Sequence, residues 1–274
     1  MNQFEYLDRV SFGQYLPTGS ILHRMDPRSK ILVYVILILA MTLTKQIMGL
    51  LLAILLVLLM LFISKVSISF ALRGLIAPLP FILLLAILQL FIAPRPSGDQ
   101  LIFSYGIFSI STASLHAAIL LCMRFTALIL LLTLVSATLS TLEMIYGLDM
   151  LCKPLQKIGV RTNSIAMMVQ IMLRFIPFLA MNAEKIAKSQ ASRGAEWDNS
   201  KGGVMRRARQ ILPLILPLFS INLQKADILA NAMLARGYGS SRQRSGLREY
   251  QFRWMDLLFV ILSVCAAWII LYFA

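Results

Sequence analysis

Long apolar runs alternate with short polar breaks over most of this chain. A helix needs about 20 apolar residues to cross the hydrocarbon core of a membrane. Five runs near this length predict membrane-spanning helices, at residues 31–44, 47–63, 75–93, 115–139 and 257–273. Because only Lys45-Gln46 separates the first two runs, we expect a tight helical hairpin there.

Two polar regions interrupt this pattern. Residues 94–113 hold prolines and glycines around a short alternating run, which predicts an external hairpin at the membrane interface. Residues 140–253 carry two ambiguous apolar stretches, 164–181 and 211–223. We interpret these as two long helices at or beneath the membrane, because spanning would place the basic segment 185–209 outside. Seven spans remain the alternative.

The pattern therefore predicts an all-α integral membrane protein with about five transmembrane helices and a polar region of long helices. The expected domains are a cytoplasmic N-terminal segment at 1–30, transmembrane helices 1–4 at 31–139, a cytoplasmic or interfacial helical domain at 140–253 and a C-terminal transmembrane helix at 254–274.

Composition and charge support a membrane location. Hydrophobic residues make up 59% of the chain and charged residues 14%, which excludes a disordered chain, a secreted disulfide scaffold and a typical cytosolic enzyme. The 26 Lys and Arg against 12 Asp and Glu give a net charge of +14. Basic residues flank the first hairpin on the side of the N-terminus, which predicts a cytoplasmic N-terminus. We expect no nucleic-acid partner, because no basic-aromatic interleaving is present.

Two segments of the polar region resemble each other. Residues 183–194 and 226–237, offset by 43, share two alanines, an acidic residue and a terminal Arg-Gly pair. Each pattern predicts a helix that ends at its glycine, which adopts the left-handed conformation at little cost. Arg193 and Arg236 would then stand at two helix tips.

The role of these arginines has two interpretations. Each could complement its own helix dipole, for less than about 1 kcal/mol. Alternatively, both could project into the cytoplasm and bind carboxylates of two similar partners, for which the planar guanidinium is suited. Small residues at helical spacing favour a close helix crossing, although alanine also simply favours helix. The candidate crossing residues are Ala183, Ala187, Ala226 and Ala230.

At these residues the chain resembles the transmembrane T component (EcfT) of energy-coupling factor transporters, a family of ABC-type importers of vitamins and metal ions in prokaryotes. The resemblance covers most of the chain. It rests on Tyr15-Leu16-Pro17, residues 23–30 (HRMDPRSK), Lys153-Pro154-Leu155, residues 173–177 (LRFIP), residues 206–209 (RRAR), the segment Pro213 to Pro217 and both Arg-Gly pairs. The short motif of the family is Ala-Arg-Gly, which the second pair matches, whereas the first has Ser192 in place of alanine.

This resemblance implies a multi-pass, non-catalytic subunit of the prokaryotic inner membrane. Two cytoplasmic ABC-type ATPase subunits would bind ATP and Mg²⁺, and this chain would bind no cofactor or metal. One membrane-embedded S component would capture the vitamin or other micronutrient. The implied ATPase-docking residues are Ser192, Arg193, Gly194, Ala235, Arg236 and Gly237. The implied S-component contacts are Met167, Met168 and Met172, because flexible methionines re-pack against different partners. Ordinary membrane-facing methionine is the other interpretation.

Other functions lack sequence support. No P-loop is present, so ATP hydrolysis would belong to partner chains. His23 is expected to anchor the interface, Asp26-Pro27 to start a helix, and Arg124, a charge inside the fourth span, to pair across the bundle or cap a cavity. A T component shared among several S components is the leading hypothesis. The alternatives are a T component dedicated to cobalt, nickel or biotin, and a self-contained secondary transporter, for which buried acids or matched broken helices are missing.

Overall fold

The computed structural model describes residues 16, 18–92, 101–105, 108–158, 162–194, 204–239 and 252–273, and the chain divides into two compact units. The bundle unit covers residues 13–160 and 250–274, and the two-helix unit covers residues 161–249 together with the first twelve. The bundle elements are α1 (Ile21–Arg24), α2 (Pro27–Leu43), α3 (Ile47–Ile63), α4 (Ile68–Ile76), α5 (Leu79–Ile92), β1 (Leu101–Tyr105), β2 (Phe108–Ser111), α6 (Thr112–Thr138), α7 (Thr141–Leu151), η2 (Lys153–Ile158) and α10 (Trp254–Tyr272). The two-helix unit holds α8 (Thr162–Ser192) and α9 (Val204–Ala235).

The predicted helical hairpin at the start of the bundle is confirmed. α2 begins at Pro27, and the Asp26 carboxylate caps it by accepting a hydrogen bond from the Arg28 amide at 2.9 Å. α2 ends before Lys45, and α3 follows directly from Ile47. The expectation that Asp26-Pro27 starts a helix is therefore correct.

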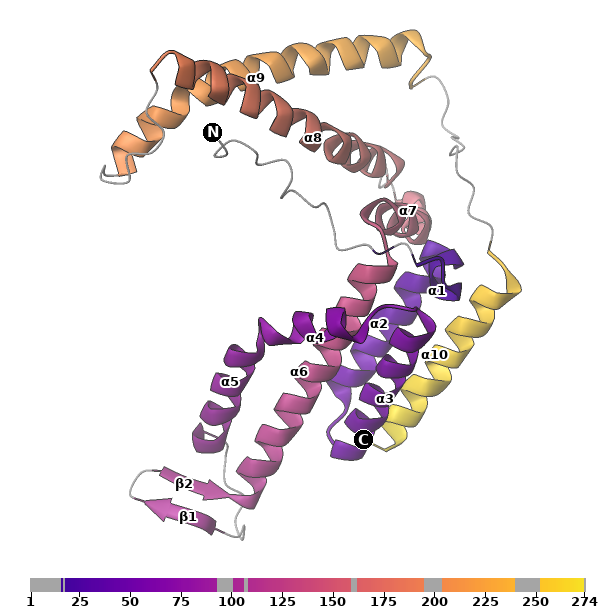
Figure 1. The fold of residues 1–274 in the computed structure, drawn as a ribbon. Helices are drawn as coiled ribbons and strands as arrows, with labels where there is room; N and C mark the ends of the chain where they lie inside the picture. Colours follow the sequence, from indigo (N-terminus) through magenta and orange to yellow (C-terminus); the bar gives the residue numbers. More distant parts are fainter. Residues whose placement is uncertain are drawn as a thin grey trace. The chain divides into compact units, whose positions relative to one another are not determined.

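Helices α2, α3, α6 and α10 run side by side and build the core of the bundle (Figure 1). The core consists mainly of small and aliphatic side chains, which permits close helix packing. Its most deeply buried members include Leu37, Met41, Ala53, Val57, Leu131, Leu134, Ala137 and Ile270. The outer faces of the same helices expose large apolar side chains such as Leu55 and Phe62, as expected for contact with lipid.

The third predicted span is not one straight helix. The structure begins it at Ile68, seven residues before the predicted start, and breaks it into α4 and α5 with a bend of 55°. The break lies at Ala77-Pro78. Proline has no amide hydrogen and clashes with the preceding helical turn, which explains a bend at this point. α5 then packs along α6.

The segment between α5 and α6 contains the predicted hairpin. β1 and β2 pair antiparallel, with Tyr105 opposite Phe108 and an irregularity between Leu101 and Phe103. This two-stranded ribbon is the exception to an otherwise helical structure in the described part of the chain. α6 follows at once, and a reciprocal pair of hydrogen bonds between Ser111 and Ser114 caps it.

Length and apolar composition identify the helices that could cross a membrane. Within the described residues, α6 and α10 qualify with mean hydropathies of 2.5 and 2.3, and the bent pair α4–α5 adds a further span. α3 is apolar but has only 17 residues. α8 (from Ser164) and α9 (from Leu212) also qualify, at lower mean hydropathies of 1.8 and 1.2. The chain is an all-α integral membrane protein with several apolar spans.

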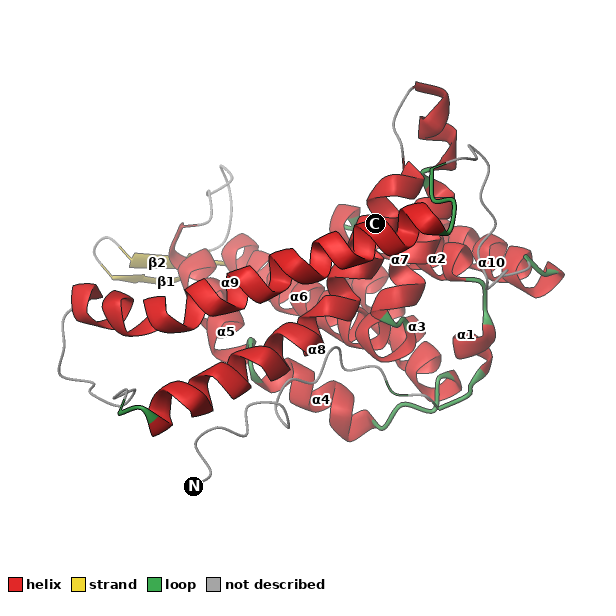
Figure 2. Cartoon of the chain, turned by 90° about the horizontal axis from the view of Figure 1, so that it is seen from above, coloured by secondary structure: helices red, strands yellow, loops and turns green. Residues whose placement is uncertain are grey.

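The two-helix unit has almost no interior of its own. α8 has 31 residues and α9 has 32, and each contains proline: Pro177 in α8, and Pro213 and Pro217 in α9. The two helices pass close to one another in both views (Figure 1, Figure 2). Thr162 is the one buried residue among those of this unit whose side chains are described.

Candidate functional site

The first Arg-Gly pair lies at the end of α8. The helix ends at Ser192, and the Gly194 amide donates a hydrogen bond to the Ala191 carbonyl at 3.0 Å. Gly194 has φ +87°, a left-handed conformation that a residue with a Cβ rarely adopts. The glycine therefore turns the chain away and leaves Arg193 at the tip.

The second pair closes α9 in the same way and with a fuller cap. The Gly237 amide donates to the Leu234 carbonyl at 2.9 Å, and the Tyr238 amide donates to the Met233 carbonyl at 2.9 Å. Gly237 has φ +74°. These two hydrogen bonds and the left-handed glycine form a Schellman motif, which satisfies carbonyls that the helix end would leave free.

Both tips are open to solvent. Ser192, Arg193 and Gly194 are exposed, and so are Ala235, Arg236 and Gly237. The ion pairs found among the described residues involve neither Arg193 nor Arg236. Each guanidinium is therefore available to a partner, and the docking role of the six residues stays a prediction.

A groove of about 390 Å³ lies between α8 and α9. It is lined on the α8 side by residues between Ile171 and Leu179, and on the α9 side by residues between Asn222 and Met233. Two of the predicted crossing residues, Ala226 and Ala230, line it and are exposed.

The other two predicted crossing residues lie farther along α8. Ala183 and Ala187 are half-buried and are not among the groove-lining residues. Of the predicted S-component contacts, Met172 lines the groove and is 63% exposed, Met168 is exposed outside it, and Met167 is half-buried. The structure thus brings Met172 together with Ala226 and Ala230.

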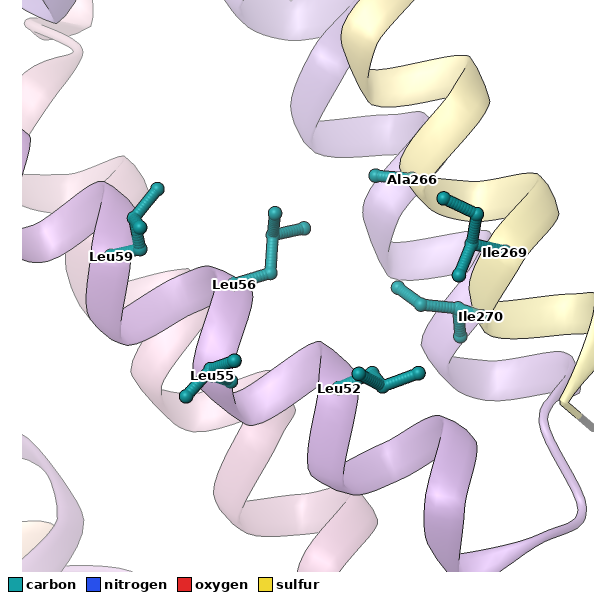
Figure 3. A pocket seen from close by; sticks show the side chains of 7 residues that line it. All are labelled: Leu52, Leu55, Leu56, Leu59, Ala266, Ile269 and Ile270. Carbon is teal, nitrogen blue, oxygen red and sulfur yellow. The ribbon is translucent and has the colours of Figure 1, made fainter.

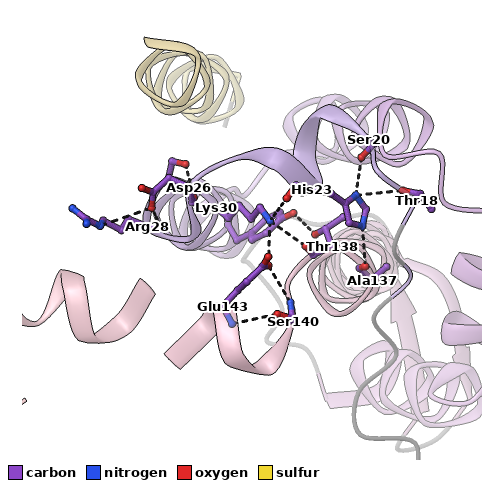
Figure 4. A network of polar contacts seen from close by, with 12 residues as sticks. Thr18, Ser20, His23, Asp26, Arg28, Lys30, Ala137, Thr138, Ser140 and Glu143 are labelled. Atoms are coloured by element: carbon purple, nitrogen blue, oxygen red, sulfur yellow. Dashed lines mark hydrogen bonds and ion pairs between the residues drawn. The ribbon is translucent and has the colours of Figure 1, made fainter. Parts of the chain in front are cut away.

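A buried polar network, which sequence reasoning missed, lies in the bundle unit (Figure 4). Lys30, 2% exposed, donates to the Glu143 carboxylate at 3.2 Å and to the His23 carbonyl at 3.0 Å. Glu143 also accepts from the Ser140 amide, and this reciprocal capping box starts α7. The network ties α7 to the beginning of α2, with the Lys30 side chain buried between them.

His23 belongs to this network and is buried, so the expectation that it anchors the interface is wrong. Its Nδ1 lies 2.7 Å from the Ser20 hydroxyl, and its Nε2 lies 3.3 Å from the Ala137 carbonyl at the end of α6 (Figure 4). The ring therefore joins the segment before α2 to the end of α6. The expectation rested on a general tendency of residues of this type to lie at a membrane interface. In this chain, the hydrogen bonds of the His23 ring to Ser20 and Ala137 determine its position instead.

A second buried carboxylate joins α10 to the start of α2. Asp256, 3% exposed, accepts from the Asp26 amide at 3.0 Å and from the Ser29 hydroxyl at 3.2 Å. It also accepts from the Arg253 amide and so caps its own helix. The signal for a helix start at Asp26-Pro27 is visible in the sequence, but its partner lies 230 residues away.

Arg124 caps a neighbouring helix inside the bundle. Its Nη2 donates to the Thr44 carbonyl at 2.5 Å, and Thr44 is the residue at which α2 ends. A cation at a helix C-terminus is stabilised by the free carbonyls there. The sequence predicts pairing across the bundle or capping of a cavity, and the structure is consistent with both, because Arg124 also lines a pocket of about 230 Å³ between α5 and α6.

A shallow apolar groove of about 210 Å³ lies between α3 and α10 (Figure 3). Leu52 and Leu56 of α3 face Ile269 and Ile270 of α10 across it. Leu55, Leu59 and Ala266 complete the lining. No polar side chain lines this groove, so it fits lipid or an apolar partner surface rather than a polar substrate.

The described residues contain no group of three or more His, Cys, Asp or Glu that could hold a metal ion. In the polar network, Lys30 and His23 donate to or lie beside carbonyls at helix ends, and Lys30 also pairs with the Glu143 carboxylate.

Comparisons with known proteins agree with this picture. A sequence family named CbiQ and described as cobalt transport protein matches residues 18–246. The chain is 35% identical over 258 residues to a protein of Brevibacillus brevis, covering 94% of this chain and 96% of the relative. It is 33% identical to a Streptococcus equi protein, with 94% of each covered, and 35% identical to a Ruminiclostridium cellulolyticum protein, with 96% of each covered. All three relatives are named energy-coupling factor transporter transmembrane protein EcfT.

Proposed function

The chain belongs to the family of energy-coupling factor transporter transmembrane proteins, and from this premise we propose that it couples two cytoplasmic ATPases to a substrate-binding S component. The chain itself is a membrane protein, the transmembrane component of such a transporter. In the proposed mechanism, nucleotide-driven movement of the ATPases is carried along α8 and α9 to the S component.

One observation carries the proposal: two arginines stand at two exposed helix tips without an ion-pair partner among the described residues. Arg193 and Arg236 each follow a long helix and precede a left-handed glycine. If each arginine served only its own helix dipole, it would stabilise that helix by less than about 1 kcal/mol. Such a role would not require the ends of α8 and α9 to have similar sequences. A guanidinium at a rigid tip gives bidentate binding of a carboxylate in a partner groove.

The two-helix unit also supplies a surface for a membrane-embedded partner. Its groove is lined almost entirely by apolar side chains, and the exposed Met172 stands in it. Flexible methionine side chains adapt to different partner surfaces at low cost. We propose that this face, with Met167 and Met168, contacts the S component, and that several S components share it.

The ATPase reaction belongs to the partners in this proposal. The sequence contains no Gly-x-x-x-x-Gly-Lys-Ser/Thr loop. ATP and Mg²⁺ would be bound by the two ATPase subunits, and this chain would hold no cofactor. The basic residues before α2 and after α3 support an orientation with the N-terminus in the cytoplasm.

The description of the matching sequence family favours a second candidate, a T component dedicated to cobalt uptake. The printed names of the three relatives carry no substrate. The two candidates differ in the number of S components that bind the chain. One S component in cells grown with several micronutrients scarce supports the dedicated function, and several support the shared function.

The test is affinity co-purification from native membranes, with mass spectrometry of the bound chains. Wild type should bring down two ATPases and at least one small membrane protein. Arg193→Glu/Arg236→Glu should lose the ATPases, because each new carboxylate would repel the partner carboxylate that the proposal pairs with the arginine. Arg174→Glu is the matched control, since it reverses an exposed arginine of α8 far from the tip.

Two results would contradict the proposal. If the double variant retains both ATPases at the wild-type level, the tips do not dock them. If the wild-type chain comes down alone, a self-contained transporter becomes the better hypothesis.

A further inference from the structure

The two tips end alike but differ in the residues that precede the Arg-Gly pair. Aligned at an offset of 43, residues 184–194 of the first tip correspond to residues 227–237 of the second. The first segment has three cations and one carboxylate, a net charge of +2, and the second has one of each, a net charge of zero. The charge around Arg193 is therefore not repeated around Arg236.

At several positions where the first tip is charged or polar, the second is apolar. Lys185 corresponds to Ile228, and Ser192 corresponds to Ala235. Ile228 is 60% exposed. Lys185 is also exposed, so the exchange takes place on the surface and not in an interior.

The last turn of α9 adds a second exposed apolar side chain. Leu234, which corresponds to Ala191 of the first tip, is 68% exposed only two residues before Arg236. Burial of a large aliphatic side chain against a partner contributes about 25 cal/mol for each Å² of apolar surface removed from water. The first tip instead presents Lys188, whose side chain is 56% exposed and pairs with Glu184.

The end of α9 is exposed over most of its circumference, and the remaining side faces the groove toward α8. Among residues 226–237, only Leu229 and Met233 are half-buried, and the others are exposed. A helix end that is exposed over most of its circumference fits a socket that surrounds its exposed side better than a flat surface. Such a socket would bury Ile228 and Leu234 together with Arg236.

On the basis of the proposed function, we propose that the two tips dock in sockets of different chemistry on the ATPase subunits. The α9 tip takes an apolar-walled socket with a carboxylate for Arg236, so apolar burial anchors it. The α8 tip takes an acidic socket, so charge anchors it. In the apolar socket, exclusion of water also strengthens the ion pair of Arg236.

This assignment predicts that ATPase retention through the two tips depends differently on salt. The screening length falls from about 10 Å at 0.1 M salt to about 3 Å at 1 M, which weakens solvent-accessible charge pairs. Apolar burial is not weakened by screening. ATPase retention through the α8 tip should therefore fall steeply with salt, and retention through the α9 tip should persist.

The experiment uses tagged full-length chain in detergent with its co-purified ATPases. Arg236→Glu leaves the α8 tip as the anchor, and Arg193→Glu leaves the α9 tip. Each complex is washed with NaCl from about 0.1 M to about 1 M, and retained ATPase is quantified by mass spectrometry. We expect retention to fall at least tenfold in Arg236→Glu and less than twofold in Arg193→Glu.

Flank variants separate the two kinds of anchor. Added to Arg193→Glu, Ile228→Gln/Leu234→Gln should lower retention at least tenfold at low salt, whereas Leu216→Gln, an equally exposed apolar position elsewhere on α9, should not. Added to Arg236→Glu, Lys185→Gln/Lys188→Gln should likewise lower ATPase retention at least tenfold at low salt.

Equal salt dependence of the two single-tip complexes, or full retention in the Ile228→Gln/Leu234→Gln variant, overturns this inference and leaves the proposed function standing. Wild-type chain that retains no ATPase at low salt overturns the proposed function, and this inference with it.

Discussion

The bundle unit and the two-helix unit place their charged side chains in opposite ways. In the bundle, Lys30 and Asp256 are buried and bonded to residues of distant helices. In the two-helix unit, Lys188 pairs with Glu184 one helical turn away, and both arginine tips stand in solvent. The bundle uses charge to join helices to one another, whereas the two-helix unit presents charge to its surroundings.

Their apolar residues differ in the same sense. The bundle has a continuous core, which includes the fully buried Met41, Leu50 and Val57. The long helices α8 and α9 have a groove instead, with Ala226 and Ala230 exposed in it. A unit with little buried apolar surface gains little stability from folding alone. We infer that the bundle is stabilised by its own core. The two-helix unit instead depends on lipid and partners to cover its apolar surface.

The largest effect is expected from breaking the buried ion pair of the bundle. In Glu143→Gln, Lys30 keeps two carbonyl acceptors but loses its carboxylate. Removing one member of a buried pair costs about 3–5 kcal/mol, and we expect the lower end because the Glu143 side chain is 15% exposed. The measurement is the Tm of the purified chain in detergent, which should fall by several degrees.

A double variant shows whether the uncompensated charge is responsible. Lys30→Met/Glu143→Gln removes the lysine as well and should recover part of the lost Tm. If Glu143→Gln alone leaves the Tm unchanged, the network does not hold the bundle together as the comparison requires.

The next effect is expected at a close approach between α3 and α10. A Cβ at Gly49 of α3 would lie 2.8 Å from the Ile270 carbonyl of α10 and 2.6 Å from Cγ2 of Thr44. Gly49→Ala should cost about 1–3 kcal/mol, because the backbone of α10 must move. The Tm in detergent measures this. Adding Thr44→Ser removes one of the two clashes and should restore only part of the stability, and a full recovery would contradict the close approach of α10.

The sequence predicts local features of both units well. Apolar runs predicted the positions of α2, α3, α6 and α10, of which α6 and α10 are long and apolar enough to cross a membrane. The glycines after Arg193 and Arg236 marked the ends of α8 and α9, because a left-handed residue stops a helix locally. These signals need no knowledge of the rest of the fold.

Contacts between distant segments could not be predicted in this way. Lys30 and Glu143 are 113 residues apart, and Arg124 reaches Thr44 across 80 residues. The capping box at Ser140 and Glu143 was visible as a pattern, yet nothing in it identifies Lys30 as the third member. The bend at Pro78 was missed because proline near a helix start is usually tolerated.

The smallest effect is expected from the same chemical change in the two-helix unit. Glu184→Gln removes the carboxylate that pairs with Lys188, as Glu143→Gln does for Lys30. Here the lysine side chain is 56% exposed, so water replaces the lost partner, and an exposed pair at this spacing contributes only about 0.3–0.5 kcal/mol. The Tm should therefore not change, and amide hydrogen exchange of α8 should rise by about twofold. A fall in Tm comparable with that of Glu143→Gln would mean that α8 is as tightly integrated as the bundle, and the contrast between the two units would not hold.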